Sequence, residues 1–295
     1  MSLRLGLIGH PVSHSLSPPM HKAALSFFGL AGTYELLDLD CSGAALKAAI
    51  LALPEQGFSG FNITIPHKQA AFETIDSSPE AAMLEAANTV RIDSAGQMFA
   101  HNTDFPGVRL ALEAVLKEQN VISLGLSSGE LKPIVLGFGG AARACIAALC
   151  ALGAKTVLIA ARNPARIEAS SKALESRISS YLQRSCQLEL STFEQLRTQE
   201  LSLLMNCTPI GLSADEPIPD WASRVFCRRN FEHMFFFDTV YKRDRSATLL
   251  MQYAQEQGIA CCDGLMMLVE QAALAFEFWT QRQIHPKHML QALEY

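Results

Sequence analysis

Several features that this sequence lacks exclude whole classes of protein. Its 295 residues carry a net charge of −5, so there is no electrostatic case for binding nucleic acid or an acidic membrane surface. No apolar run is long enough to span a bilayer, because glycine, polar or charged residues interrupt every one. Residues 1–6 lead directly into an expected strand without an apolar signal segment, and we therefore expect a cytoplasmic protein.

The cysteines and histidines show none of the usual metal or redox spacings. No two of the eight cysteines form a CxxC pair, and most lie in apolar or helical contexts. We therefore expect all eight to be reduced side chains of the protein interior. His14, His21, His67 and His101 match neither HxxxH nor HExxH, and no cluster of acids or cysteines accompanies them. The sequence thus predicts no metal site.

What is present indicates a folded α/β protein. Hydrophobic residues make up 49% of the chain and charged residues 18%, which is enough apolar material for packed cores. The length suits one large domain or two ordinary ones. Strands and helices alternate over the first hundred residues or so, as in an α/β layer. The strands expected in this part cover residues 3–8, 33–39, 60–65, 88–92 and 97–100, the last two joined as a hairpin.

A glycine-rich turn in the second half predicts a dinucleotide site. A strand at 134–138 runs into Gly137-Phe138-Gly139-Gly140-Ala141-Ala142, and a helix follows to Leu152. The glycines let the backbone approach a pyrophosphate, and the helix start offers unpaired N–H groups and a positive dipole end. An ordinary tight turn is the alternative, but the strand and helix on either side favour nucleotide binding. Further strands are expected at 156–160, 201–206 and 235–240.

The end of the second strand of this unit bears on which cofactor binds. A site for NAD usually places an acid there for the ribose 2′-OH. In this chain the first acid after the expected strand at 156–160 is Glu168, which lies too far along. Arg162 and Arg166 can instead hold a 2′-phosphate by planar, charge-assisted hydrogen bonds. The alternative is that both arginines contact only water. The sequence favours NADP over NAD.

Five short segments, far apart in sequence, carry polar residues that suit one active site. They are Ser15-Leu16-Ser17, residues 62–68, Asn88, Asn102-Thr103-Asp104 and Gln271. A lysine near a helix start is mildly unfavourable against the helix dipole, so a functional reason for Lys68 gains weight. Lys68 can bind an oxygen and exchange a proton with it, and Asp104 is its obvious partner.

Each of these residues also has a purely structural interpretation. Lys68 could be an exposed surface residue, and Thr103 or Asp104 could cap the helix that begins there. Ser17 could likewise cap a helix at residue 18, and Asn88 could fix a turn. Gln271 lies on an apolar helix, where a buried polar group needs a partner, and a ligand is one candidate.

Eight stretches, in one order along nearly the whole chain, carry a resemblance to a known family. They are HPVSHSLSPPMHKAAL (10–25), GFNITIPHK (60–68), AANTV (86–90), HNTD (101–104), LGFGGAARA (136–144), NCTPIGL (206–212), FDTVYK (237–242) and DGLMMLVEQAALAFEFW (263–279). With these stretches the chain resembles the shikimate dehydrogenase family, including its quinate/shikimate branch.

The resemblance implies a fold and an activity. The fold would be α/β, with an N-terminal substrate domain (1–104) that helices at 264–295 complete, a Rossmann-like NADP-binding domain (105–263), and a cleft between them. The activity would be NADP-dependent interconversion of 3-dehydroshikimate and shikimate, in chorismate and aromatic amino acid biosynthesis. The implied partner is a small-molecule substrate, and the protein would be a monomer or a homodimer.

Residue by residue, the resemblance implies that Lys68 and Asp104 are the catalytic pair. The implied substrate-binding residues are Ser15, Ser17, Asn62, Thr64, Asn88, Tyr241 and Gln271. The implied cofactor-binding residues are Gly137, Phe138, Gly139, Gly140, Ala141, Ala142, Arg162, Asn163, Arg166, Thr208 and Gly264, with Thr208 on the nicotinamide side. Hydride transfer to a ring ketone creates an alkoxide that needs positive charge and a proton. Lys68 can supply both, and the sequence leaves open which matters more.

Three bulky residues depart from the family pattern, namely Phe105, Phe138 and Met266. Quinate or an amino-substituted shikimate therefore remains an alternative substrate, since matched hydrogen bonds in a buried site decide between such analogues. A Rossmann dehydrogenase with an unrelated substrate is a further alternative. An inactive nucleotide-binding regulatory protein is an alternative from another class, although loss of activity would have freed Lys68 and Asp104 to change.

Overall fold

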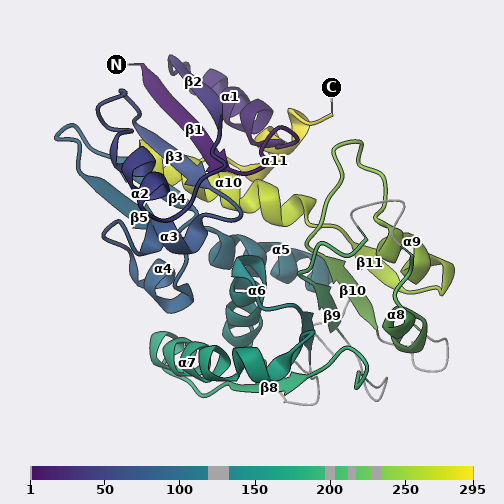
Figure 1. Cartoon of the computed structure of the whole chain (residues 1–295). Helices are drawn as coiled ribbons and strands as arrows, with labels where there is room; N and C mark the ends of the chain where they lie inside the picture. The colour runs from purple at the N-terminus through teal and green to yellow at the C-terminus, as the bar shows by residue number, and fades with distance from the viewer. Residues whose placement is uncertain (1, 119–132, 197–202, 212–216, 227–233, 295) are drawn as a thin grey trace. The chain divides into compact units, whose positions relative to one another are not determined.

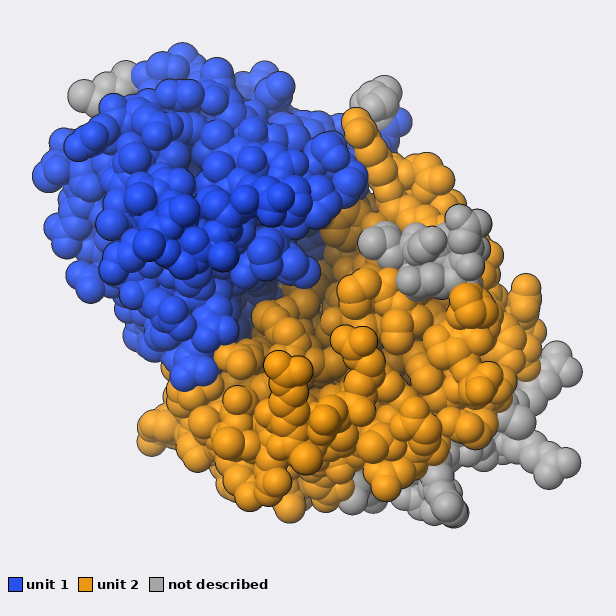
Figure 2. Space-filling view, in the orientation of Figure 1, with its two compact units in different colours: residues 1–107, 268–295 blue, residues 108–267 orange. Residues whose placement is uncertain are grey.

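The computed structural model describes residues 2–118, 133–196, 203–211, 217–226 and 234–294. The chain forms two compact units, one of residues 1–107 with 268–295 and the other of residues 108–267 (Figure 2). Each unit is built on its own sheet, so the fold class is α/β, as predicted. Two long helices, α5 (Asp104–Glu118) and α10 (Leu265–Thr280), contribute residues to both units.

The sheet of unit 1 has five strands in the order β2-β1-β3-β4-β5. Strand β1 runs parallel to both of its neighbours, β2 and β3. Strand β4 pairs antiparallel with both β3 and β5. The predicted hairpin is therefore confirmed. The bounds are β1 (Leu3–Gly9), β2 (Gly32–Asp38), β3 (Gly60–Ile63), β4 (Thr89–Ile92) and β5 (Met98–His101).

Helices cover this sheet and complete unit 1. In Figure 1, α11 lies beside α1, which also packs on β2. The unit-1 part of α10 packs on the sheet, where Trp279 Nε1 donates a hydrogen bond of 2.8 Å to the Val90 carbonyl oxygen of β4. A Cβ at Gly60 would lie 2.6 Å from the Trp279 ring, so only glycine permits this approach. The remaining bounds are α1 (Ser17–Phe27), α2 (Gly43–Leu51), α3 (Lys68–Phe72), α4 (Pro79–Leu84) and α11 (Pro286–Gln291).

The core of unit 1 contains a histidine. The His21 ring is fully buried and stacks on the Tyr34 ring, with 4.5 Å between centroids. Trp279 lies on it at 5.0 Å. Burial lowers the pKa of His21 to about 3, because the interior penalises the charged imidazolium. His21 is therefore a neutral aromatic core residue at pH 7.

The sheet of unit 2 has six parallel strands in the order β11-β10-β9-β6-β7-β8. Counted within the unit, this is 6-5-4-1-2-3, the strand order of the dinucleotide-binding Rossmann fold. The strands are β6 (Ile134–Leu136), β7 (Thr156–Ala160), β8 (Gln187–Ser191), β9 (Leu203–Asn206), β10 (Phe235–Asp238) and β11 (Ala260–Cys262). The helices are α6 (Gly140–Ala151), α7 (Pro164–Leu182), α8 (Asp220–Val225) and α9 (Leu249–Glu256).

Strands β6, β9 and β10 are buried along their whole length, as expected for parallel strands covered on both faces. Their apolar runs made them predictable. Strands β8 and β11 were missed, because β8 lacks a continuous apolar run and β11 has only three residues. Residues 201–202 of the predicted strand at 201–206 lie outside the described residues.

The prediction that all eight cysteines are reduced is wrong for two of them, and Cys227 lies outside the described residues. Cys150 and Cys186 form a disulfide, with 6.0 Å between their Cα atoms. Cys150 lies in the last turn of α6 and Cys186 precedes β8, so the βαβ crossover brings together residues 36 apart in sequence. A local CxxC pattern does not reveal such a contact.

In the described part of the chain, no helix is long and apolar enough to cross a membrane.

Candidate active site

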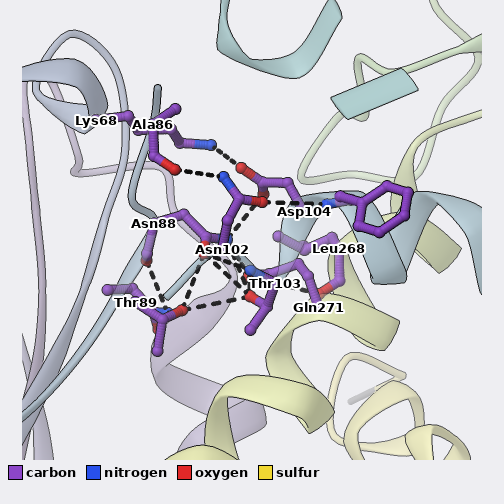
Figure 3. A network of polar contacts seen from close by, with 11 residues as sticks. Lys68, Ala86, Asn88, Thr89, Asn102, Thr103, Asp104, Leu268 and Gln271 are labelled. Carbon is purple, nitrogen blue, oxygen red and sulfur yellow. Dashed lines mark hydrogen bonds and ion pairs between the residues drawn. The ribbon is translucent and has the colours of Figure 1, made fainter. Parts of the chain in front are cut away.

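The site in unit 1 is built around an ion pair. Lys68 Nζ lies 2.7 Å from Asp104 Oδ2, and the two side chains are only 17% and 7% exposed (Figure 3). Lys68 is the first residue of α3, and the preceding residue His67 is anchored by a 2.8 Å contact from its Nε2 to the Leu39 carbonyl oxygen. The interpretation of Lys68 as a solvated surface residue is therefore wrong.

Asp104 is free to pair with Lys68 because another residue caps its helix. The Asn102 Oδ1 atom accepts a hydrogen bond from the Phe105 backbone N–H at 3.2 Å, as a capping side chain does. Asn102 Nδ2 in turn donates to the Ala86 carbonyl oxygen at 2.8 Å. The alternative that Asp104 itself serves as the cap is thus wrong, and its carboxylate is left for side-chain partners.

Asn88 connects this pair to the surrounding structure. Its Nδ2 donates to Asp104 Oδ1 at 2.9 Å and to Thr103 Oγ1 at 3.0 Å. Its Oδ1 accepts from the Thr103 backbone N–H at 2.7 Å. Asn88 therefore holds the Asp104 oxygen that Lys68 does not contact. Its role extends beyond fixing a turn, because the side chain is 2% exposed and contacts the acid directly.

Gln271 joins the same network from α10. Its Oε1 lies 3.4 Å from both Asn88 Nδ2 and Thr103 Oγ1, and its Nε2 donates to the Leu268 carbonyl oxygen at 2.8 Å (Figure 3). A Cβ at Gly107 would lie 2.9 Å from the Gln271 backbone, so glycine there lets α5 and α10 approach each other. The polar residue on this apolar helix therefore has protein partners.

Asn62 lies behind the network, where two residues that the sequence did not single out contact it. Its Oδ1 accepts from the Tyr34 hydroxyl at 2.7 Å, and its Nδ2 donates to Thr89 Oγ1 at 3.0 Å. The Thr89 hydroxyl in turn donates to Asn88 Oδ1 at 3.1 Å. Tyr34 lies on β2 and carries no local signal, so only strand pairing could reveal its role. Thr64, by contrast, is half-buried at the end of β3.

The two serines near the amino terminus behave differently from the expectation of a Ser17 cap. The residue preceding α1 is Leu16, and Ser17 is already helical. Ser15 Oγ accepts a hydrogen bond from the Ser17 backbone N–H at 3.1 Å, so Ser15 satisfies the helix start. No hydrogen bond links either serine to Lys68 or Asp104 within the described residues.

The candidate nucleotide site lies in unit 2. Strand order reverses between β6 and β9, and dinucleotides bind beyond the carboxyl ends of strands at such a point. Gly137 follows β6 with φ of 95°, which favours glycine, and Gly139 precedes α6 with open space where a Cβ would be. Phe138 is half-buried, and the Arg143 guanidinium lies 5.2 Å from its ring centroid. This turn and helix start can receive a pyrophosphate.

Two arginines lie beyond the next strand, β7. Arg162 and Arg166 are both exposed, and no ion pair to either occurs among the described residues. Asn163 Oδ1 accepts from the Arg166 backbone N–H at 3.3 Å and so caps α7. Both guanidiniums are thus available for a phosphate, and no carboxylate takes the place that recognition of a ribose 2′-OH would need. These features fit NADP.

Three further predicted residues follow β9, β10 and β11. Thr208 Oγ1 donates to Asn206 Oδ1 at 2.7 Å, and its methyl group lies 3.1 Å from where a Gly137 Cβ would be. The backbone of Gly264 passes so close to Thr239 that any Cβ would collide with its carbonyl. Burial raises the pKa of Tyr241, and its hydroxyl is therefore neutral at pH 7.

Among the described residues, no three histidine, cysteine or acidic side chains gather as metal ligands would.

Comparison with known proteins relates nearly the whole chain to one family. Residues 7–90 match the model of the shikimate dehydrogenase substrate binding domain, and residues 264–294 match the shikimate 5'-dehydrogenase C-terminal domain. The chain is 35% identical to a shikimate dehydrogenase (NADP(+)) of Methanopyrus kandleri over 98% of this chain and 94% of that protein.

Solved structures give the same result. A shikimate 5-dehydrogenase of Thermus thermophilus in complex with NADP(H) and shikimate is 34% identical, with a TM-score of 0.74 over 99% of this chain and 98% of that one. A quinate dehydrogenase of Corynebacterium glutamicum in complex with NAD is 28% identical, with a TM-score of 0.79 over 99% of both chains.

Proposed function

This chain belongs to the shikimate dehydrogenase family, and we propose that it catalyses the NADP-dependent interconversion of shikimate and 3-dehydroshikimate. The observation that carries the proposal is the buried Lys68–Asp104 pair, whose second carboxylate oxygen is held by Asn88. A carboxylate fixed on both oxygens keeps the ammonium group in one place. Such a preorganised charge stabilises an oxygen that becomes negative in the transition state.

The residues of unit 1 account for the proton side of the reaction. When bound, the cofactor supplies or accepts a hydride at its nicotinamide ring. In the reducing direction the substrate ketone gains a hydride and a proton, and Lys68 Nζ is positioned to donate that proton or to neutralise the alkoxide. Asp104 would orient Lys68 and accept a hydrogen bond from a neighbouring substrate hydroxyl. In the oxidising direction Lys68, as the neutral amine, would receive the hydroxyl proton.

The other polar groups of unit 1 fit a polyhydroxy ring. Ser15, Ser17, Thr64 and Gln271 offer hydroxyl and amide groups, and Asn62 and Asn88, which contact Tyr34 and Asp104, would bind the substrate as well. In unit 2 we propose that the Gly137–Ala142 turn binds the pyrophosphate and that Arg162, Asn163 and Arg166 bind the 2′-phosphate. Thr208 and Gly264 would then lie on the nicotinamide side of the cofactor, and Tyr241 would bind the substrate.

A steady-state assay tests the proposal directly. The purified protein is given shikimate or quinate, each with NADP or NAD, and formation of the reduced nicotinamide is followed by its absorbance. We expect kcat/KM to be highest for shikimate with NADP, by at least about tenfold over each other pair. NADPH binding without turnover of any cyclitol would instead favour the regulatory alternative.

Quinate is the second candidate substrate because a quinate dehydrogenase is as similar in fold to this chain as a shikimate dehydrogenase is. The quinate dehydrogenase of Corynebacterium glutamicum has a TM-score of 0.79 against this chain. Phe105, which follows Asp104, is 6% exposed and packs as core, and its bulk adjoins the catalytic acid. Faster turnover of quinate than of shikimate would move the assignment to that branch, and use of NAD would additionally contradict the role of the two arginines.

A further inference from the structure

Two buried polar residues of unit 2 have no role of their own in the function proposed above. Asp238 ends β10 and Asn206 ends β9, and the two are paired across neighbouring parallel strands. Both are fully buried. Asn206 Nδ2 donates to Asp238 Oδ1 at 3.0 Å, so an amide and a carboxylate meet at the carboxyl edge of the sheet. Groups buried in this way need a reason, because desolvating a carboxylate is costly.

The carboxylate of Asp238 has donors on both oxygens. Oδ1 also accepts from the Val240 backbone N–H at 3.1 Å, and Oδ2 accepts from Thr248 Oγ1 at 2.6 Å. Burial raises the pKa of Asp238 to about 6, and these three donors act in the opposite direction. Three donors on its two oxygens are what an ionised carboxylate, which only accepts hydrogen bonds, requires.

An ionised Asp238 decides which way the Asn206 amide points. A carboxylate attracts the NH2 end of the amide, and this end also donates to the Ile210 carbonyl oxygen at 3.0 Å. The amide oxygen then faces the other way, where it accepts from the Thr208 backbone N–H at 3.1 Å and from Thr208 Oγ1 at 2.7 Å. Thr208 is thus held through Asn206 by a residue that it does not touch.

Thr208 lies where the second half of a dinucleotide is expected. The Rossmann fold consists of two mononucleotide-binding halves, here β6–β8 and β9–β11. Arg162 and Arg166 follow β7 in the first half, so the phosphorylated adenosine belongs there. Thr208 follows β9 in the second half and approaches Gly137 across the point where the strand order reverses. The nicotinamide therefore belongs on the side of Thr208.

We propose that Asp238 is a positioning residue for the nicotinamide end of NADP, acting through the Asn206 amide on the Thr208 turn. This inference rests on the proposed function. Affinity for the cofactor comes mainly from the phosphates, whereas orientation of the nicotinamide affects the hydride step. Loss of Asp238 should consequently reduce kcat more than it weakens binding.

The test compares Asp238→Asn, Asn206→Ala and the double variant. Each is assayed for kcat, for the Kd of NADPH by calorimetry, and for the fluorescence emission of bound NADPH, which reports the surroundings of the nicotinamide. We expect Asp238→Asn to lower kcat by about tenfold or more, to change Kd by less than about threefold, and to alter the emission of the bound cofactor. Because Asp238 acts through Asn206, the double variant should be no slower than Asn206→Ala alone.

Thr248→Val is the matched control. It removes the donor to the other carboxylate oxygen and the cap of α9, where Thr248 accepts from the Met251 backbone N–H. We expect this variant to have a lower Tm with kcat and emission close to those of the wild type. An equal loss of kcat in Thr248→Val and Asp238→Asn would overturn the proposal in favour of general destabilisation, as would additive losses in the double variant.

The outcomes separate this inference from the proposed function. Wild-type turnover of shikimate together with unchanged kcat and emission in Asp238→Asn would reject only the positioning role. If the wild type binds NADPH but turns over no substrate, the proposed function fails, and the emission comparison still decides the role of Asp238. If the wild type binds no NADPH, both are rejected.

Discussion

Asn88 donates a hydrogen bond of 2.9 Å to the Asp104 oxygen that Lys68 does not contact. The carboxylate is thereby held between an amide and an ammonium group, in surroundings where Asn88 and Asp104 are almost inaccessible to water. A charge interaction is stronger in such a place than at the surface. The pair is therefore a fixed feature of unit 1, present before any substrate arrives.

Replacement of the lysine should abolish most of the activity. Lys68→Ala removes the ammonium group that contacts Asp104, and we expect kcat to fall by about 100-fold to 10,000-fold with a smaller change in KM. Lys68→Arg keeps the charge but does not release a proton at neutral pH. Substantial activity in Lys68→Arg would assign Lys68 an electrostatic role, and its absence would favour proton transfer. The control is Lys47→Ala, which changes an exposed lysine on α2. Wild-type turnover in Lys68→Ala would contradict the catalytic assignment.

The two arginines beyond β7 should determine cofactor choice. Arg162→Ala combined with Arg166→Ala removes two charged donors to a 2′-phosphate, so we expect kcat/KM for NADP to fall by about 100-fold. The value for NAD should hardly change, because NAD lacks that phosphate. Lys172→Ala on α7, the helix that also carries Arg166, is the control, since the Lys172 side chain is exposed and pairs with Glu168. Equal losses with both cofactors would mean that the arginines contact only water.

Asn88 should matter for stability as well as activity. Asn88→Ala leaves the Thr103 N–H and one Asp104 oxygen without their buried partner, so we expect the free energy of unfolding to fall by about 3 kcal/mol. Asn88→Asp should cost at least as much, because it places a second carboxylate beside Asp104. Urea unfolding measures both. Gln69→Ala, at an exposed side chain, should stay within about 0.5 kcal/mol of the wild type, and a similarly small effect at Asn88 would argue against this network.

His21 should make the protein sensitive to acid. In the unfolded chain its pKa is about 6.5, whereas burial lowers it to about 3 in the folded state. Below pH 6.5 His21 therefore binds a proton in the unfolded chain but not in the folded chain. The free energy of unfolding consequently falls as the pH falls toward 3. At pH 5 this group alone should cost about 2 kcal/mol. His21→Phe keeps the ring stack and lacks the titration, so its stability should change less between pH 7 and pH 5. Identical pH dependence in urea unfolding of the two proteins would refute this account.

Much of the fold could be predicted because its signals are local. The turn 137–142 shows a strand, glycines and a helix in one short stretch, and the alternation of elements indicated an α/β protein. The family resemblance likewise rests on short motifs such as residues 60–68. Patterns of this kind depend on neighbours in the sequence, where backbone geometry and hydrophobic periodicity act directly. Lys68 and Asp104 were recognisable for the same reason.

Tertiary structure alone decided which partners these residues have. The sequence allowed Asp104 and Ser17 to cap helices. In the structure, Asn102 and Ser15 accept the hydrogen bonds at those helix starts instead. Tyr34 and Thr89 support the site without any local signal, and Cys150 meets Cys186 only through a crossover. Residue types and local spacing determined which chemistry this chain can carry. Pairing of distant strands and helices determined which donor meets which acceptor, because a hydrogen bond depends on distances that the linear sequence does not contain.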